Sequence, residues 1–194
     1  MAGKGRPRSE STEKAILNSA HALVTDHGFQ AVTIEGIAKH AGVSKATIYK
    51  WWPNKAAVVA DSFFTTLKEQ YPVPDTGSVI EDLVIQISNL SSFLASDEGR
   101  IIRELIAEGQ SDSDVAEAYQ SRYFSPRREV SRTILERGVE RGEMKSGLNL
   151  ELCVEMIYAP LFYRLLITGE GIDEEFLRSV VSCVLKGLGA FSAL

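Results

Sequence analysis

A short basic stretch of the chain, "AGVSKATIYKWWPNK" at residues 41–55, contains the residue types that bind nucleic acid. Its side chains that can donate hydrogen bonds to bases or phosphates include Ser44, Lys45, Thr47, Tyr49 and Lys50. Lysine can donate to guanine, and hydroxyl groups can donate to phosphate oxygens. Ile48 stands among these residues and, with Ile37 and Ala38, is predicted to face inward. The spacing therefore indicates a helix whose polar face meets a polyanion.

The distribution of charge favours the same chemistry. The 194 residues carry a formal net charge of −5. Residues 1–55 nevertheless hold eight Lys and Arg against four Asp and Glu, which leaves thirteen basic and twenty-two acidic residues for the rest of the chain. Since residues 1–55 are basic and the rest of the chain is acidic, we predict that only residues 1–55 bind a polyanion.

The sequence shows no local pattern for catalysis or metal binding. It has no phosphate-binding loop and no neighbouring Ser-His-Asp or Cys-His arrangement. His21, His27 and His40 lack the spacing of metal ligands. We therefore predict a protein that is not an enzyme and that has no cofactor and no metal. Carboxylates assembled by the fold leave an enzyme as an alternative.

The cellular location is predicted from the apolar segments. The N-terminus has no apolar run typical of a signal peptide. The most apolar stretch, residues 156–167, is shorter than the roughly 20 residues that a bilayer requires. Cys153 and Cys183 lie in apolar runs, which is typical of buried cysteines in a reducing compartment. These features predict a soluble, cytoplasmic protein with no membrane partner.

The donors of the basic stretch must be positioned by short helices around a turn. Thr33 and Ser44 are predicted N-caps of two such helices, and Gly42 is the predicted turn between them. The second helix should end at about Trp51, because Pro53 breaks it. Two short helices joined in this way form a helix-turn-helix, whose second helix can enter the major groove.

Almost every other segment also has helical periodicity. A first helix is predicted to open at Ser11 or Thr12 and to close at Gly28. Asn54 should cap the next helix, and residues 72–78, "PVPDTGS", are a predicted linker. Later helices are expected at about 78–95, 98–109, 113–141, 149–168 and 173–191, with a bend or break at Ser125-Pro126 and a kink at Pro160. The predicted fold class is all-α.

The segment "TIEGIAKHAGVSKATIYKWWPNKAAVVADSFF" resembles the DNA-binding signature of TetR-family transcriptional regulators. The shared pattern runs Thr, an Ile-Ala pair, Ala-Gly-Val-Ser, Thr-x-Tyr, two aromatic-type positions and Lys, and the resemblance spans residues 12 to about 64. Trp51 and Trp52 depart from the pattern, since histidine or tyrosine is common at the first position and phenylalanine at the second. The resemblance implies an N-terminal three-helix helix-turn-helix DNA-binding domain and a larger helical domain for ligand binding and dimerisation. We expect the first at residues 1–55 and the second at 56–194, joined through a helix at about 54–71.

The resemblance also implies roles for individual residues in DNA binding. Phosphate contacts are expected from Thr33, Thr47, Tyr49 and Lys55, and from the indole N–H of Trp51. Base reading is expected from some of Ser44, Lys45, Ala46 and Lys50. The N-terminal "GKGRPR", with Arg6 and Arg8, resembles basic arms that follow the minor groove or the backbone. Thr33 and Ser44 can equally be simple N-caps, Trp52 a core residue, and the arm a disordered tail.

The second domain is expected to bind an effector and a second copy of the chain. Six residues mix aromatic, apolar and acidic groups and are the candidate effector contacts: Phe93, Glu104, Tyr119, Tyr123, Met156 and Phe162. The resemblance implies that the last two helices pair with their symmetry mates, which makes the candidate interface Phe162, Leu166, Phe176, Val180, Val184 and Leu188. Ordinary core packing is the alternative for each of these residues.

The function that follows is a ligand-responsive, homodimeric DNA-binding regulator. Its partners are a palindromic double-stranded DNA operator and a small-molecule effector, and the resemblance favours a repressor that the effector releases from the operator. An architectural DNA-binding protein without an effector, an activator and an enzyme are the alternatives.

Overall fold

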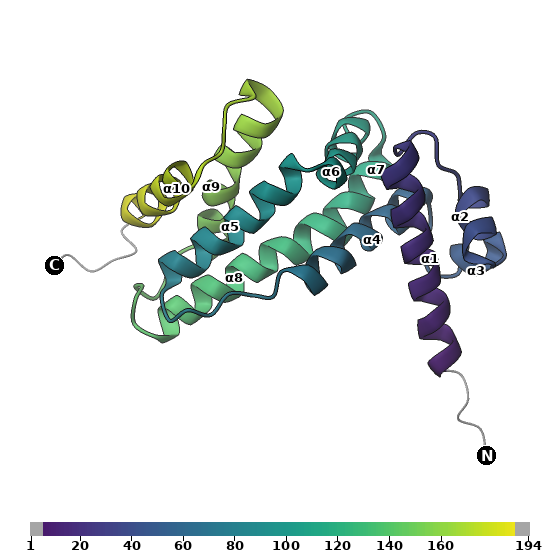
Figure 1. Ribbon diagram of the computed structural model, residues 1–194. Coiled ribbons are helices and arrows are strands. Elements are labelled where there is room, and N and C mark those ends of the chain that lie inside the picture. Colours follow the sequence, from purple (N-terminus) through teal and green to yellow (C-terminus); the bar gives the residue numbers. More distant parts are fainter. Residues whose placement is uncertain (1–5, 189–194) are drawn as a thin grey trace, which may run out of the picture. The chain divides into compact units, whose positions relative to one another are not determined.

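The computed structural model describes residues 6–188, excluding the side chains of residues 6–9, 66, 67, 69 and 70 (Figure 1). All regular secondary structure in this part of the chain is helical, which confirms the predicted all-α class. Contacts group the chain into two compact units. One consists of residues up to 70 together with 97–125, and the other of residues 71–96 together with those from 126 onward. The contacts thus divide the chain differently from the predicted domains 1–55 and 56–194.

The first unit is built on two long helices. Its elements are α1 (Arg6–His27), α2 (Ile34–Ala41), α3 (Lys45–Tyr49), α4 (Lys55–Gln70), α6 (Asp97–Glu108), α7 (Ser113–Tyr119) and the π-helical turn η1 (Gln120–Phe124). α1 packs against α2 and α4, and α4 packs against α7 and η1. The buried side chains between them include Ile16, Val24, Ile37, Ile48 and Phe63. This apolar core holds the short helices α2 and α3 in place.

The start of α1 differs from the sequence prediction, and its end agrees with it. The predicted start at Ser11 or Thr12 is wrong, because α1 begins at Arg6. Pro7 does not prevent this, since a proline in the first turn of a helix loses no intrahelical hydrogen bond. The predicted end is confirmed: Gly28 follows His27 with φ +81°, a conformation that glycine adopts without strain.

The second unit packs its last helix on two others. Its elements are α5 (Val79–Ala95), α8 (Ser125–Glu140, of which Ser125 belongs to the first unit), α9 (Leu150–Tyr163), the π-helical turn η2 (Arg164–Thr168) and α10 (Glu174–Gly187). α10 packs against α5 and α9. Its core includes Leu83, Ile87, Val154, Ile157, Val181 and Leu185. Residues 72–77 form the predicted linker, and Ser78 caps α5.

Neither predicted proline interrupts its helical segment, and the predicted bend at Ser125-Pro126 and kink at Pro160 stay predictions. The helix expected at 113–141 runs from Ser113 to Glu140 without a break, and the turn before Pro126 widens to the π form of η1. A proline lacks the N–H donor and crowds the carbonyl four residues earlier, so the wider turn accommodates Pro126 inside a continuous helix. Pro160 lies inside α9, which continues to Tyr163. The helix predicted at 173–191 ends at Gly187, and residues 189–191 lie outside the described part.

The two cysteines have different environments. Cys153 is buried, and burial raises the pKa of its thiol. Cys183 is exposed, so the prediction that both are buried is wrong for this residue. The reason is helical period: Val184 and Val180 face the core, and Cys183 lies about 100° around α10 from Val184.

Candidate DNA-binding helix and effector cavity

The turn between α2 and α3 is held by its own side chains. The Thr33 hydroxyl accepts a hydrogen bond from the Gly36 amide at 3.1 Å, and the Ser44 hydroxyl accepts one from the Thr47 amide at 3.2 Å. Gly42 has φ +68° and places the chain between the two helices. The predicted N-caps and turn are therefore confirmed, and they orient α3 through contacts within a few residues.

α3 has one buried face and one exposed polar face. Ile48 is buried against the rest of the first unit. Residues on the opposite face are exposed, namely Ser44, Lys45, Ala46, Tyr49 and Lys50, and Thr47 is half-buried. Tyr49 is 53% exposed despite its aromatic ring. The predicted base-reading residues are thus all exposed, on α3 itself and at its two caps.

Lys45 is paired with an acidic residue of α2. Its Nζ lies 2.7 Å from Glu35 Oε1, and both side chains are more than half exposed. The hydrogen bond from Lys45 lowers the pKa of the Glu35 carboxyl, and Glu35 raises the pKa of Lys45. Exposed ion pairs are weak, so Lys45 can exchange Glu35 for a guanine or a phosphate at little cost.

Lys55 is directed toward its own unit. Its Nζ donates to the Phe29 carbonyl at 2.7 Å and lies 4.0 Å from the centre of the Phe29 ring. Burial lowers the pKa of Lys55, and the nearby Glu108 carboxylate opposes that shift. The ammonium therefore anchors the turn between α1 and α2, and its predicted phosphate contact stays a prediction.

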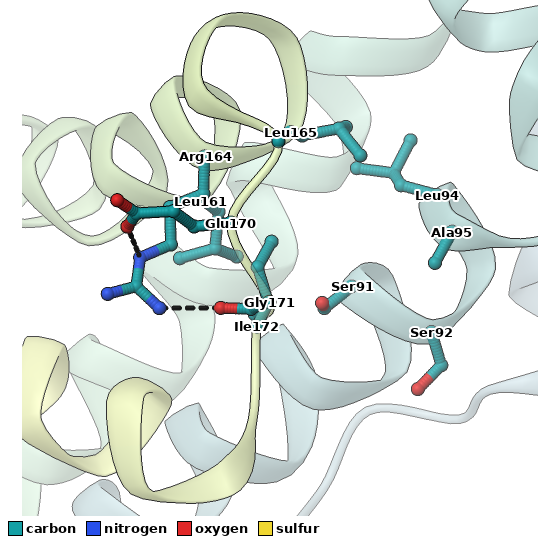
Figure 2. A pocket seen from close by; sticks show the side chains of 11 residues that line it. Ser91, Ser92, Leu94, Ala95, Leu161, Arg164, Leu165, Glu170, Gly171 and Ile172 are labelled. Carbon is teal, nitrogen blue, oxygen red and sulfur yellow. Dashed lines mark hydrogen bonds and ion pairs between the residues drawn. The ribbon is translucent and has the colours of Figure 1, made fainter.

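The second unit contains a cavity of about 380 Å³ (Figure 2). It lies between the last turns of α5 and a wall formed by the end of α9, η2 and the loop at 169–172. The lining residues are Ser91, Ser92, Leu94, Ala95, Leu161, Arg164, Leu165, Gly169, Glu170, Gly171 and Ile172. Most of this surface is aliphatic, and its size lies within the roughly 300–1,000 Å³ typical of small-molecule sites.

The charged groups of the cavity neutralise each other. Arg164 Nε lies 3.3 Å from Glu170 Oε2, and Nη1 donates to the Gly171 carbonyl at 2.5 Å. Figure 2 shows both contacts as dashed lines. The guanidinium also stacks 3.6 Å from the centre of the Phe176 ring. Arg164 is therefore committed to the loop that follows η2.

Comparison with known proteins decides the family. Residues 16–61 match "Bacterial regulatory proteins, tetR family", and residues 73–184 match "Tetracyclin repressor-like, C-terminal domain". The chain belongs to the TetR family. The uncharacterized HTH-type transcriptional regulator YdeS of Bacillus subtilis (strain 168) is 50% identical over 190 residues, which cover 98% of this chain and 96% of YdeS. This TetR-family protein is a DNA-binding transcriptional regulator.

Solved structures share the whole fold. The TetR family transcription regulator SCO0332 has a TM-score of 0.81 and 32% identity, and the match covers 91% of this chain and 97% of that one. FadR of Thermus thermophilus, solved in complex with lauroyl-CoA, has a TM-score of 0.69 and 23% identity, with 93% of this chain and 97% of that one covered. At this identity the likeness to FadR shows the fold alone.

The candidate effector residues of this TetR-family protein are divided between the two units. Glu104, Tyr119 and Tyr123 belong to the first unit, and Phe93, Met156 and Phe162 to the second. Their burial differs: Phe93, Tyr119 and Tyr123 are buried, Glu104 and Phe162 are half-buried, and Met156 is exposed. None of the six lines the cavity of the second unit. Their role as effector contacts stays a prediction.

Glu104 has a structural task in the first unit. Its Oε2 accepts a hydrogen bond from the Phe29 amide at 2.9 Å, and its Oε1 pairs with Arg100. Glu108, one turn later, accepts a hydrogen bond from Gln30 Nε2 at 2.6 Å. α6 thus holds the turn between α1 and α2 with two carboxylates.

The two tryptophans also have different tasks. Trp52 is 2% exposed, as predicted for a core residue, and its Nε1 donates to Asp61 Oδ2 at 2.6 Å. Arg122 Nη1 of η1 donates to the same oxygen at 2.6 Å. Trp51 is half-buried and packs edge-on against Trp52. Sequence reasoning missed Asp61 and Arg122, which are 61 residues apart and share no local pattern.

The candidate interface is partly covered within the chain itself. Val180 and Val184 are buried, because their stripe of α10 faces α5 and α9, so they belong to the core of their own unit. Phe162, Phe176 and Leu188 are half-buried, and Leu166 is exposed. A different set of apolar residues is exposed along one side of α9 and η2: Leu152, Met156, Tyr163, Leu166 and Ile167, called the α9–η2 stripe below.

The predicted basic arm lies at the start of α1. The side chains of Arg6 and Arg8 lie outside the described residues, although their backbone forms the start of α1.

Within residues 6–188 no helix is long and apolar enough to cross a membrane. The described side chains also form no group of three or more His, Cys, Asp or Glu that could hold a metal ion.

Proposed function

We propose that this TetR-family protein is a homodimeric repressor that binds a palindromic operator through α3 and leaves it when a small molecule binds. The exposed polar face of α3 carries the proposal. Lys45, Tyr49 and Lys50 point outward over the buried Ile48. A recognition helix of this kind reads base edges in the major groove, while neighbouring residues contact phosphates.

A two-fold dimer is supported by the α9–η2 stripe. Its members recur at helical spacing and reach 73% exposure at Ile167. A contiguous apolar surface of this kind is typical of a protein–protein interface. A second copy of the chain presenting the same stripe would cover it and would place two α3 helices on successive half-sites. Acting on chromosomal operators, the dimer would work in the cytoplasm.

The release of DNA follows from linkage. A dimer binds both half-sites only at one separation of its two α3 helices. An effector that prefers another separation weakens operator binding, and the operator weakens effector binding by the same factor. A coupling of about 1–3 kcal/mol is sufficient for regulation.

The operator is the first experiment. We expect selection from random DNA to yield a palindrome, and binding to fall with salt by about 0.9 log units of affinity per log unit of salt for each phosphate neutralised. Lys50→Ala should cost about 1–3 kcal/mol on the selected operator and relax the preference at one base pair in each half-site. Lys186→Ala, which removes an exposed lysine of α10, is the matched control and should leave binding unchanged.

Two results would overturn the proposal. One is an affinity that does not change between low and physiological salt. The other is a Lys50→Ala variant that selects the same consensus with the same affinity as the parent protein.

A further inference from the structure

We infer that the cavity of the second unit binds an uncharged small molecule with an aliphatic body and one hydrogen-bonding end. The inference rests on the proposed function, since it names the class of effector and its site. The body is specified by the walls. Leu94 and Ala95 from α5 line one side of the cavity, and Leu161, Leu165 and Ile172 line the other. The cavity has a volume of about 380 Å³. Burial of an alkyl chain against such walls is favourable because it removes apolar surface from water.

The charge of the ligand is specified by Arg164. Its guanidinium already has the Glu170 carboxylate, the Gly171 carbonyl and the Phe176 ring as partners. An anionic ligand would have to displace Glu170 and leave that carboxylate beside the incoming negative charge. A cationic ligand would have to compete with Arg164 for Glu170. The cavity therefore favours a molecule without charge.

The polar end of the ligand is specified by two serines. Ser91 and Ser92 line the cavity from α5, and Ser91 lies across it from Gly171 and Ile172 (Figure 2). Serine in a helix commonly bonds a carbonyl of the preceding turn, as Ser121 does with Glu117. Among the described residues the hydroxyls of Ser91 and Ser92 have no such partner. They are therefore available to donate to, or accept from, an alcohol, ester or amide group.

The cavity wall is continuous in sequence with the proposed dimer surface. η2 contributes Leu165 to the cavity, and the next two residues, Leu166 and Ile167, belong to the exposed α9–η2 stripe. The wall continues through Gly169 and Gly171, where a Cβ atom in place of hydrogen would meet nothing within 4 Å. A ligand that moves this wall changes the surface on which the second copy would rest.

Three probes of equal chain length test the class of ligand. The full-length protein is titrated by calorimetry with 1-octanol, octanoate and octylamine, which share the eight-carbon body and differ in charge. We expect 1-octanol to bind about tenfold or more tightly than either charged probe, because each charged probe must break the Arg164–Glu170 pair or lose its own hydration. Equal or tighter binding of octanoate or octylamine overturns the inference.

Variants test the site. Ala95→Phe fills the cavity and should abolish 1-octanol binding, whereas Ala107→Phe, at an exposed alanine of α6, should leave it intact. Replacing Ser91 and Ser92 together by alanine keeps the cavity open and should weaken 1-octanol binding about fivefold. The control is Ser182→Ala, at a half-buried serine of α10 that does not line the cavity, and it should leave binding unchanged. Binding of 1-octanol to Ala95→Phe with unchanged affinity, or to neither the wild type nor any variant, overturns the inference.

Operator binding separates this inference from the proposed function. All the variants should bind the selected operator with wild-type affinity in the absence of probe, since none lies in α3. Failure of the wild type to bind any DNA sinks the proposed repressor, whereas normal operator binding with no 1-octanol binding sinks only the assignment of the cavity.

Discussion

Arg127 of α8 is a buried charge without a hydrogen-bonded partner on two of its nitrogens. The residue is 5% exposed, and neither Nε nor Nη2 has a hydrogen-bond partner among the described residues. Two neutral groups lie near its backbone: the hydroxyls of Ser131 and Tyr158 lie 2.9 Å apart, and Tyr158 donates to the Arg127 carbonyl at 3.5 Å. Removing a guanidinium from water without a counter-ion opposes folding.

We therefore expect Arg127→Met to stabilise the protein. Methionine fills a similar volume without charge, and the free energy of unfolding should rise by about 1–4 kcal/mol. The adjacent Arg128 is the control, because it is half-buried and pairs with Glu151 and Glu155. Arg128→Met should change stability by less than about 1 kcal/mol. Urea denaturation followed by circular dichroism measures both, and a lower midpoint for Arg127→Met would show that the guanidinium stabilises the fold.

At the scale of the element, α3 depends on a cap that also lies on the DNA-binding face. Its five residues are too few to form a stable helix alone, so the Ser44 hydroxyl and the burial of Ile48 hold it. The same Ser44 is exposed beside Lys45. Capping and DNA contact can be separated because they require different properties of the side chain.

Three replacements of Ser44 separate the two roles. Ser44→Ala removes the cap and should lower the free energy of unfolding by about 1 kcal/mol, whereas Ser44→Gly should cost only a few tenths. Ser44→Asp keeps the cap and the stability, but its carboxylate repels phosphate, so operator affinity should fall. Thermal unfolding and fluorescence anisotropy measure the two effects. Equal operator affinity for Ser44→Asp and the wild type would place Ser44 away from the DNA.

At the scale of the whole molecule, the last helices have two apolar surfaces, of which one is buried within its own unit and the other is exposed. The stripe of α10 that contains Val184 is 6% exposed at that residue and packs within its own unit. The α9–η2 stripe is exposed along its length. A charge placed on the first must disturb folding, whereas a charge placed on the second must disturb only an association between copies.

The corresponding prediction compares Ile167→Glu with Val184→Glu. Ile167→Glu should give a folded monomer, because the carboxylate is tolerated in water but not at an apolar dimer contact. Val184→Glu should lose several kcal/mol of folding stability, because it buries an unpaired carboxylate. Light scattering gives the mass and circular dichroism the folding. A folded dimer for Ile167→Glu would move the interface away from the α9–η2 stripe.

The sequence by itself determined the features that depend on neighbours a few residues apart. The caps at Thr33 and Ser44, the turn at Gly42 and the buried Ile48 all act within one or two helical turns. Such local patterns also specify the all-α class, since side-chain periodicity and capping are properties of a single segment. The family signature lies in this same region, and for that reason the sequence was enough to identify it.

Only the tertiary structure decided which distant residues meet. Asp61 pairs with Arg122 across 61 residues, and Glu104 holds the Phe29 amide across 75. The hydrophobic periodicity of the sequence predicts neither contact, because the partner of a side chain depends on how whole helices pack. The cavity and the burial of Val184 have the same origin: an apolar stripe shows that a helix face is covered, but only packing decides what covers it.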